Sequence, residues 1–333
     1  MKRFAFSILI AFCFATSTSF AQLTGDQSDY EPFADSTGSG GTSYSTGQPL
    51  FGNSPTLPPG FDAVATEGVG VPSWWEYIDA ATLTSTPSVT VVAGALPYAG
   101  LAASASGKSA QFHGTGSSAL YNLTTDISGT GYTAALGYTT IYYSFTLSLS
   151  DINSLPKDGS GANLLAGFTK VESHKNTSAT PTSVGAQLWI RSDGVNGYQL
   201  GLEGGAGTVT LATPIFDIDS HALGETLFVV GQYDFTTASS SLWINPIPGG
   251  AQPPADLVDS TTSAMQRVAS FTIFGDDPEV GSGGFAITGQ IDNLRDGLTW
   301  AAVTPAPEPS TCALAALGLA ALGGRRVRRK NSQ

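Results

Sequence analysis

The chain has almost no cysteine and carries little charge. Its 333 residues include two cysteines, Cys13 and Cys312, and each lies close to one end of the sequence. The long stretch between them therefore has no disulfide, no thiolate metal site and no cysteine nucleophile. Charged residues make up 12 % of the chain, whereas glycine is abundant at 40 residues. This composition favours short strands joined by turns over long helices.

The first 21 residues have the order of regions found in a secretory signal peptide. Lys2 and Arg3 form a basic start, and an apolar stretch at 4–14 follows. Small side chains then lead up to Ala21. This order predicts that residues 1–21 are removed after Ala21 during export.

The other end of the chain combines prolines, an apolar run and a basic cluster. Residues 305–333 begin with Pro307, Glu308 and Pro309, and an apolar segment at 311–324 follows. That segment is about 21 Å long as a helix, which is short for a span that needs about 20 residues. It can still contact a membrane while its basic end stays on the cytoplasmic side. The basic tail, 325–330, consists of Arg325, Arg326, Arg328, Arg329 and Lys330, with one valine among them.

In this order of parts, the tail resembles the PEP-CTERM sorting signal of Gram-negative bacteria, although its alanine-rich run is weakly apolar. The resemblance implies recognition near Pro307, Glu308 and Pro309 by an exosortase-type membrane peptidase. It also implies transient membrane contact through the C-terminal segment and export through the inner membrane to the cell surface or extracellular matrix.

Removal of both ends changes the charge of the chain. Seven of the 14 basic and 25 of the 26 acidic residues remain, so the net charge falls from −12 to about −18. So negative a body argues against nucleic acid and anionic lipid as its electrostatic partners.

The remaining sequence divides into a leader and one large domain. Residues 22–60 are rich in Gly, Ser, Thr and Pro without periodicity, and we expect a mobile or loosely pinned arm. Within 61–304, residues 139–150 alternate apolar and polar side chains, which predicts a half-buried strand. The dipeptides Asp193-Gly194 and Asn196-Gly197 predict a hairpin at 184–205. Two apolar strand patterns around a Ser/Thr-rich turn predict a second hairpin at 225–246. Further strands are expected at 88–94, 163–171, 267–275 and 284–300.

This set of strands predicts an all-β domain of two antiparallel sheets packed face to face as a jelly roll. The strings LFVVGQYDFTTASSSLWINP and GQIDNLRDGLTW resemble the concanavalin A-like, laminin-G-like sandwiches, over about residues 110–303. That resemblance implies the fold but not the activity, since the same sandwich serves sugar binders, glycan-cleaving enzymes and adhesion modules.

Catalytic patterns are missing from the sequence. No Glu-x-Asp-x-x-Glu strand occurs, and Asp217 and Asp219 share a strand face without a suitably placed glutamate. We interpret that pair as a polar strand edge or turn. The histidines His113, His174 and His221 lack metal-ligand spacing, so each is expected at the surface or in a turn.

Two groups of residues could bind ligands. Asp276, Asp277 and Glu279 form a candidate calcium site in a glycine-flanked loop, although acidic loops without EF-hand spacing are commonly just solvated. Trp189 and Trp243 lie in expected strands and are candidates for stacking on sugars. Core positions are favoured for both tryptophans. Trp74 and Trp75, near the domain edge, are a further aromatic pair.

The sequence therefore predicts an exported, surface-sorted β-sandwich that is not an enzyme and has a structural, adhesive or matrix role. The alternative is a lectin-like module that binds extracellular polysaccharide, with or without calcium. A glycoside hydrolase or polysaccharide lyase is the less favoured third hypothesis.

Overall fold

The computed structural model of the chain describes twelve stretches of it. They are residues 28–31, 74–77, 89–101, 107–113, 118–122, 132–169, 184–204, 213–260, 265, 267–268, 270–273 and 287–305. Within these ranges the chain is mainly strand, with one 3-10 turn, η1 (Ala134–Leu136), and one short helix, α2 (Trp300–Val303). No helix in the described stretches is long and apolar enough to cross a membrane.

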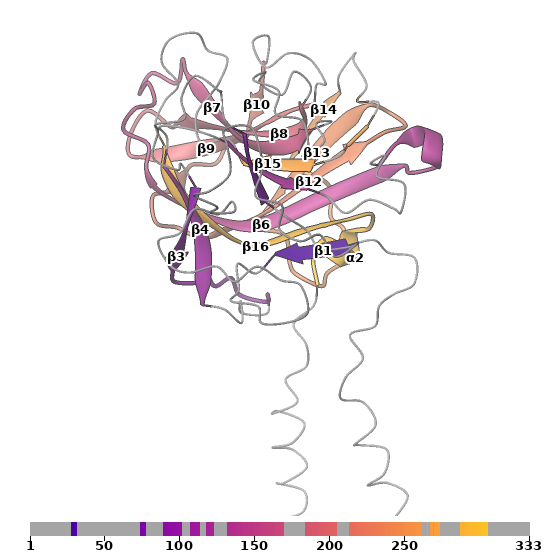
Figure 1. The fold of residues 1–333 in the computed structure, drawn as a ribbon. Helices are drawn as coiled ribbons and strands as arrows, with labels where there is room; N and C mark the ends of the chain where they lie inside the picture. The colour runs from indigo at the N-terminus through magenta and orange to yellow at the C-terminus, as the bar shows by residue number, and fades with distance from the viewer. Residues whose placement is uncertain are drawn as a thin grey trace, which may run out of the picture.

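The first sheet has eight strands. Its order is β14 (Leu257–Ser260), β13 (Ser239–Ile244), β12 (Leu227–Asp234), β6 (Thr140–Asp151), β16 (Thr288–Gly297), β4 (Lys108–His113) and β3 (Val89–Ala93), with β1 (Ser28–Glu31) also paired to β16. The long strand β6 therefore lies near the middle of this sheet (Figure 1).

The second sheet also has eight strands. Its order is β10 (Ile215–Phe216), β9 (Gly197–Glu203), β8 (Val184–Ser192), β7 (Ala162–Thr169), β15 (Ser270–Ile273), β5 (Ser118–Asn122) and β2 (Trp74–Tyr77), with β11 (His221–Ala222) also paired to β9. The strand pairs of both sheets are antiparallel. The predicted all-β, two-sheet jelly-roll class is confirmed.

A single apolar core fills the space between the sheets. Its aromatic centre joins Tyr143 of the first sheet to Phe168 and Phe271 of the second, with ring centroids 5.2 and 5.0 Å away. Gly231 on the neighbouring strand gives Tyr143 its room, because a Cβ there would lie 2.1 Å from the tyrosine Cζ. The packing inside the first sheet therefore leaves no room for a side chain at position 231.

The two sheets are also joined by hydrogen bonds through the backbone of Ala186 in β8. The Tyr143 hydroxyl donates to the Ala186 carbonyl oxygen at 2.9 Å, and the Ala186 N–H donates to Ser240 Oγ at 3.1 Å. Ala186 has a φ of 47°, in the left-handed region. Its peptide groups therefore bond across the sandwich, where the β7–β8 register shifts.

The expectation that β6 is half-buried is wrong. Its inner side chains lie in the core as the alternation predicts, but Tyr142, Ser144 and Thr146 on the other face are buried as well. A second apolar cluster covers this outer face. It consists of Tyr142, Phe228, Val230, Trp243, Trp300 and Val303. Helix α2, which supplies the last two, lies along the sheet in Figure 1.

Both predicted hairpins are present, and further strands appear outside the expected ranges, namely β1, β2, β4, β5, β10, β11 and β14. In the β8–β9 turn, Asp193 Oδ1 accepts hydrogen bonds from Val195 N and Gly197 N at 2.8 and 2.9 Å. Strand β1 lies within the predicted leader, and its backbone pairs with residues 294–297 of β16. The leader therefore supplies one strand to the first sheet.

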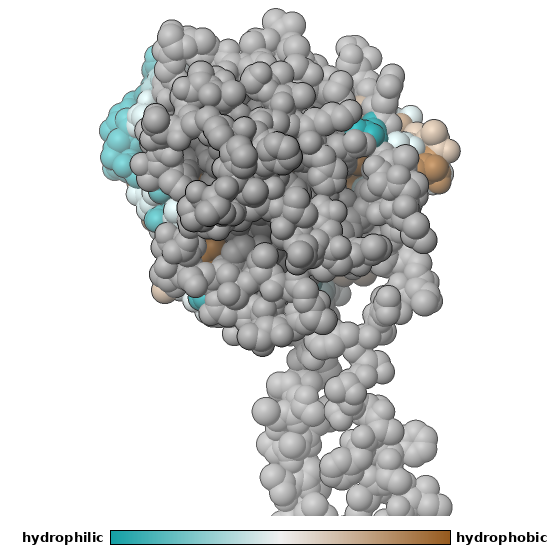
Figure 2. Space-filling model, in the orientation of Figure 1, coloured by the Kyte–Doolittle hydropathy of each residue, from teal (hydrophilic) through white to brown (hydrophobic). Residues whose placement is uncertain are grey.

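The visible surface of the described residues is mixed in polarity. Figure 2 shows a hydrophilic area on one side and a smaller hydrophobic area where Figure 1 places η1. Leu136 of η1 is 51 % exposed, and isolated exposed leucines of this kind are common on soluble proteins.

The Tyr143 hydroxyl gives a direct test of the bond between the sheets. We expect Tyr143→Phe to lower the free energy of unfolding by about 1–3 kcal/mol, because the Ala186 carbonyl loses a buried donor. Urea unfolding followed by fluorescence measures this change. Tyr138→Phe, at a half-buried position, is the matched control and should cost less than about 0.5 kcal/mol. Equal costs for both variants would contradict the importance assigned to this bond.

Candidate functional site

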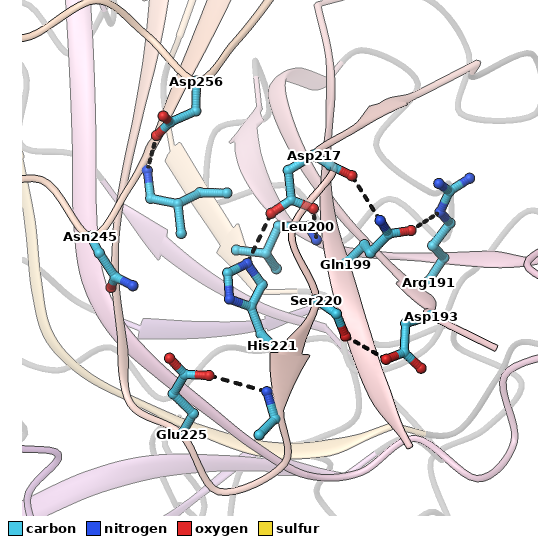
Figure 3. A network of polar contacts seen from close by, with 12 residues as sticks. Arg191, Asp193, Gln199, Leu200, Asp217, Ser220, His221, Glu225, Asn245 and Asp256 are labelled. Carbon is cyan, nitrogen blue, oxygen red and sulfur yellow. Dashed lines mark hydrogen bonds and ion pairs between the residues drawn. The ribbon is translucent and has the colours of Figure 1, made fainter. Parts of the chain in front are cut away.

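A network of polar side chains closes one edge of the second sheet, around the segment between β10 and β11 (Figure 3). Its centre is a buried ion pair, in which His221 Nε2 lies 2.9 Å from Asp217 Oδ2. The other carboxylate oxygen of Asp217 accepts a hydrogen bond from Leu200 N at 3.1 Å. One carboxylate therefore joins β9 to β11.

The network continues onto the outer face of the sheet. Gln199 Nε2 donates to the Asp217 carbonyl oxygen at 2.9 Å, and Arg191 Nε donates to Gln199 Oε1 at the same distance. The Arg191 guanidinium carbon lies 4.1 Å from the centre of the Phe216 ring. Gly201 leaves space for that ring, since a Cβ there would lie 2.6 Å from Phe216 Cε1.

Two further carboxylates hold the turns beside this centre. The Ser220 hydroxyl donates to Asp193 Oδ2. Glu225 Oε2 accepts a hydrogen bond from Ala222 N at 3.1 Å. Both contacts lie within the view of Figure 3 and fix the chain on either side of His221.

The charge state of His221 depends on several neighbours. Burial by itself lowers its pKa, but the hydrogen bond and charge of Asp217, with Glu225 and Asp219, outweigh burial and raise the pKa above its ordinary value. The Tyr198 ring packs 5.6 Å from the imidazole, centre to centre. Burial, together with Glu225 and Asp217, strongly raises the pKa of Tyr198, and its hydroxyl is buried without a hydrogen-bond partner.

This arrangement is suited to holding the fold rather than to nucleophilic chemistry. The Ser220 hydroxyl donates to Asp193 and not to His221, so the two do not form a serine–histidine relay. After β11 the chain crosses to the first sheet, and Gly224 N donates to Leu149 O of β6 at 2.8 Å. The Asp217–His221 pair therefore stabilises the crossing between the sheets.

The expectation that His221 lies at the surface or in a turn is wrong, because it is 7 % exposed and belongs to β11. Asp217 and Asp219 do lie at a strand edge, between β10 and β11. One signal in the sequence could have shown this pair. Asp217 and His221 are four residues apart, and the segment between them links β10 to β11. His113 lies in β4 at a half-buried position, and His174 lies outside the described residues.

Both strand tryptophans occupy buried clusters. Trp189 is 4 % exposed and Trp243 is 3 % exposed. The indole N–H of Trp189 donates to Gln187 Oε1 at 3.1 Å, and that of Trp243 donates to the Pro253 carbonyl oxygen at 2.9 Å. These positions favour the core interpretation over stacking on sugars, because neither ring has a face open to solvent.

The other candidate residues cannot be placed. Asp276, Asp277 and Glu279 lie outside the described residues, as do Ala21 and the whole of the tail from 306 onward. Among the residues that the structure does describe, no group of three or more His, Cys, Asp or Glu side chains could hold a metal ion. Calcium binding at the 276–279 loop therefore stays a prediction.

One buried carboxylate was not singled out from the sequence. Asp292 of β16 is fully buried, and its Oδ2 accepts a hydrogen bond from Leu96 N at 3.0 Å. Its Oδ1 accepts from Asn293 N at 2.7 Å. Burial raises the pKa of Asp292 to about 6, against the opposing effect of these two N–H groups. The side chain thus pins the segment around Leu96 to β16.

Comparison with known proteins identifies the tail. Residues 305–330 match the family model of the PEP-CTERM protein-sorting motif, as the sequence predicts. No curated protein matches the chain.

Solved structures similar to the chain include a botulinum neurotoxin and a pentraxin. One is botulinum neurotoxin type C, whose cell entry depends upon interaction with two ganglioside molecules. It is 11 % identical with a TM-score of 0.36, over 63 % of this chain and 43 % of that chain. Another is a heptameric SAP-like pentraxin from Limulus polyphemus, 10 % identical with a TM-score of 0.31, over 47 % and 63 % of the two chains. The chain thus spans less than half of the neurotoxin chain, and these low scores carry no argument about activity.

The pH dependence of stability tests the histidine pair. The pKa of His221 is raised in the folded state, so its stabilising effect is full below the unfolded pKa and is lost as the pH rises through the folded pKa. We therefore expect His221→Gln to lower the free energy of unfolding more at about pH 5.5 than at about pH 8.5.

Urea unfolding at both pH values measures this difference. His113→Gln on β4 removes a histidine from a half-buried position outside this network and serves as the control for the loss of an imidazole. An equal cost of His221→Gln at the two pH values would contradict the ion pair. NMR titration of the imidazole in Asp217→Asn should then show its pKa falling, because burial is no longer opposed by that charge.

Proposed function

We propose that this chain is an exported, surface-sorted, non-catalytic β-sandwich with a structural or adhesive role in the extracellular matrix. The observation that carries the proposal is the PEP-CTERM motif at residues 305–330, which begins directly behind a folded body. Thr304, next to the motif, is 1 % exposed and donates from Oγ1 to the Trp300 carbonyl oxygen at 2.8 Å. The sorting motif therefore follows directly on the folded body in the sequence.

The non-catalytic part of the proposal is supported by the geometry of the polar network. Its central histidine is buried, and the carboxylates beside it accept hydrogen bonds from backbone N–H groups or from Ser220. Glycan cleavage needs a pair of carboxyl groups that reach one bond of a substrate in a groove. Asp217, Asp193 and Glu225 are instead engaged in holding turns.

Carbohydrate binding is the second candidate, and one feature favours it. The Arg191 side chain is half-exposed and fixed over Phe216, yet its described hydrogen bond uses Nε alone. The two Nη groups, which point away from Gln199 in Figure 3, are free to donate to sugar hydroxyls. A glycan array probed with and without calcium tests this role, and binding lost in Arg191→Ala but kept in Lys157→Ala would support it.

Removal of the tail tests the sorting proposal. We expect the full chain, produced in its native host, to be recovered at the cell surface without residues 311–333. A variant that ends at Thr304 should instead accumulate in the periplasm or the medium, because it lacks the segment that holds it at the membrane. Cell fractionation with immunoblotting measures both. The same distribution for the two forms would refute the proposal.

A further inference from the structure

Three uncharged segments meet at the place where the chain leaves the folded body. They are residues 94–101, residues 246–255 and residues 299–305, and none contains Asp, Glu, Lys or Arg. We call the surface that they form the exit face. The rest of the body is strongly acidic by comparison, so this face differs from its surroundings.

The contacts between the three segments are specific. Trp300 Nε1 donates to the Gly250 carbonyl oxygen at 3.0 Å, and Gly249 N donates to the Thr304 carbonyl oxygen at 2.7 Å. A Cβ on Gly100 would lie 3.4 Å from the Pro248 ring. Segments far apart in the sequence therefore touch one another around α2.

The exit face is also fixed to the sheet beneath it. The Tyr98 ring packs 5.5 Å from Phe228, and Leu96 N is held by the buried Asp292. The Ser144 hydroxyl of β6 donates to the Val303 carbonyl oxygen at 2.6 Å. These contacts hold the exit face in a fixed position on the first sheet.

Several apolar side chains of this face point into solvent. Ile247 is 78 % exposed, a large fraction for an isoleucine. The other exposed residues of low polarity are Pro97, Ala99, Ala251, Pro253, Pro254 and Ala301. The large aromatic rings, Trp243 and Trp300, are turned inward. The exposed surface is therefore weakly apolar, and its one tyrosine, Tyr98, is partly buried, so it offers little of the Trp, Tyr and Arg surface common in protein interfaces.

The sorting tail keeps this face close to a membrane. Thr304 is the last buried residue in the part of the chain that the structure describes, and the apolar run of the tail begins at 311. Six residues, 305–310, span at most about 20 Å even when fully extended. While the apolar run is in the bilayer, the body is therefore held within that distance of the lipid.

The distribution of charge on the body then favours one orientation toward the lipid surface. A body with a net charge of about −18 is repelled by anionic headgroups, whereas an uncharged face is not. One exposed acidic residue, Asp256, follows directly on the loop 246–255. The contact that fits this pattern is shallow and apolar, and it persists at high salt.

We propose that the exit face is the surface that the body lays against the lipid bilayer before the tail is removed, with Ile247 entering the headgroup boundary. This inference rests on the proposed sorting function, because the tail must reach the membrane first. The occupant is the lipid surface itself rather than the processing peptidase. The orientation presents the motif at 305–330 at the membrane with α2 still docked.

Site-specific fluorescence on the full chain tests this orientation. Cys13 and Cys312 are replaced by serine, and an environment-sensitive probe is attached at Ile247→Cys or, as the matched control, at Ile218→Cys. Ile218 is 95 % exposed and follows β10, which lies at the other end of the body from α2 in Figure 1. The protein is added to phosphatidylcholine vesicles whose acyl chains carry a quencher. We expect the probe at 247 to be quenched severalfold more than the probe at 218, with and without high salt.

The outcomes separate this inference from the sorting proposal. If the chain does not float with the vesicles, both proposals are overturned. If it floats but the two probes are quenched equally, the orientation alone is overturned. Shielding of the probe at 247 that appears only after an exosortase-type peptidase is added would assign the face to the peptidase and would also overturn it.

An acidic substitution gives an independent readout. Ile247→Asp changes an exposed side chain, so the fold is expected to persist. The fraction of full chain that floats with the vesicles should fall severalfold, whereas Ile218→Asp should leave it unchanged. Equal flotation of the two variants would contradict the contact.

Discussion

The central strand β6 is buried on both faces from Ile141 to Leu147, and the rest of the architecture follows from this constraint. Its inner side chains meet the second sheet, which is the ordinary situation in a β-sandwich. Its outer face carries Tyr142 and Ser144, which are buried as well. A separate cover is therefore needed, and α2 with the loop 246–255 supplies it. The hydroxyl of Ser144 bonds to this cover directly.

That cover is also the last part of the chain before the sorting motif. Helix α2 packs on the first sheet at residues 300–303, and the sorting motif begins at residue 305. The hydrogen bonds of Thr304 and Trp300 hold the end of the described body in place. The six described residues of the covering cluster all precede the tail, so its cleavage would leave them in the chain. The uncharged loops 94–101 and 246–255 lie beside residues 299–305, which precede the tail.

Local patterns in the sequence predicted the strands whose side chains alternate and the hairpin whose turn carries Asp-Gly and Asn-Gly. They predicted the sorting tail as well, since its signal is the order of parts in one short segment. The cover over β6 was missed because residues 246–255 and 300–303 are far from β6 in the sequence. No local pattern shows that they pack on this strand. Strand β1 was missed for the same reason, since SDYE has no apolar alternation and depends on its pairing with β16. His221 was misplaced because a histidine looks polar until its buried carboxylate partner is known.

The central claim is that a finished sandwich, closed by its own C-terminal helix, is delivered to the surface by a tail that is then removed. Mass spectrometry of the C-terminal peptide from protein recovered at the cell surface tests this claim most directly. The account predicts a mature end between residues 305 and 310, with Trp300 and Thr304 retained. A mature end before Thr304, or an intact basic tail on the surface protein, would contradict it.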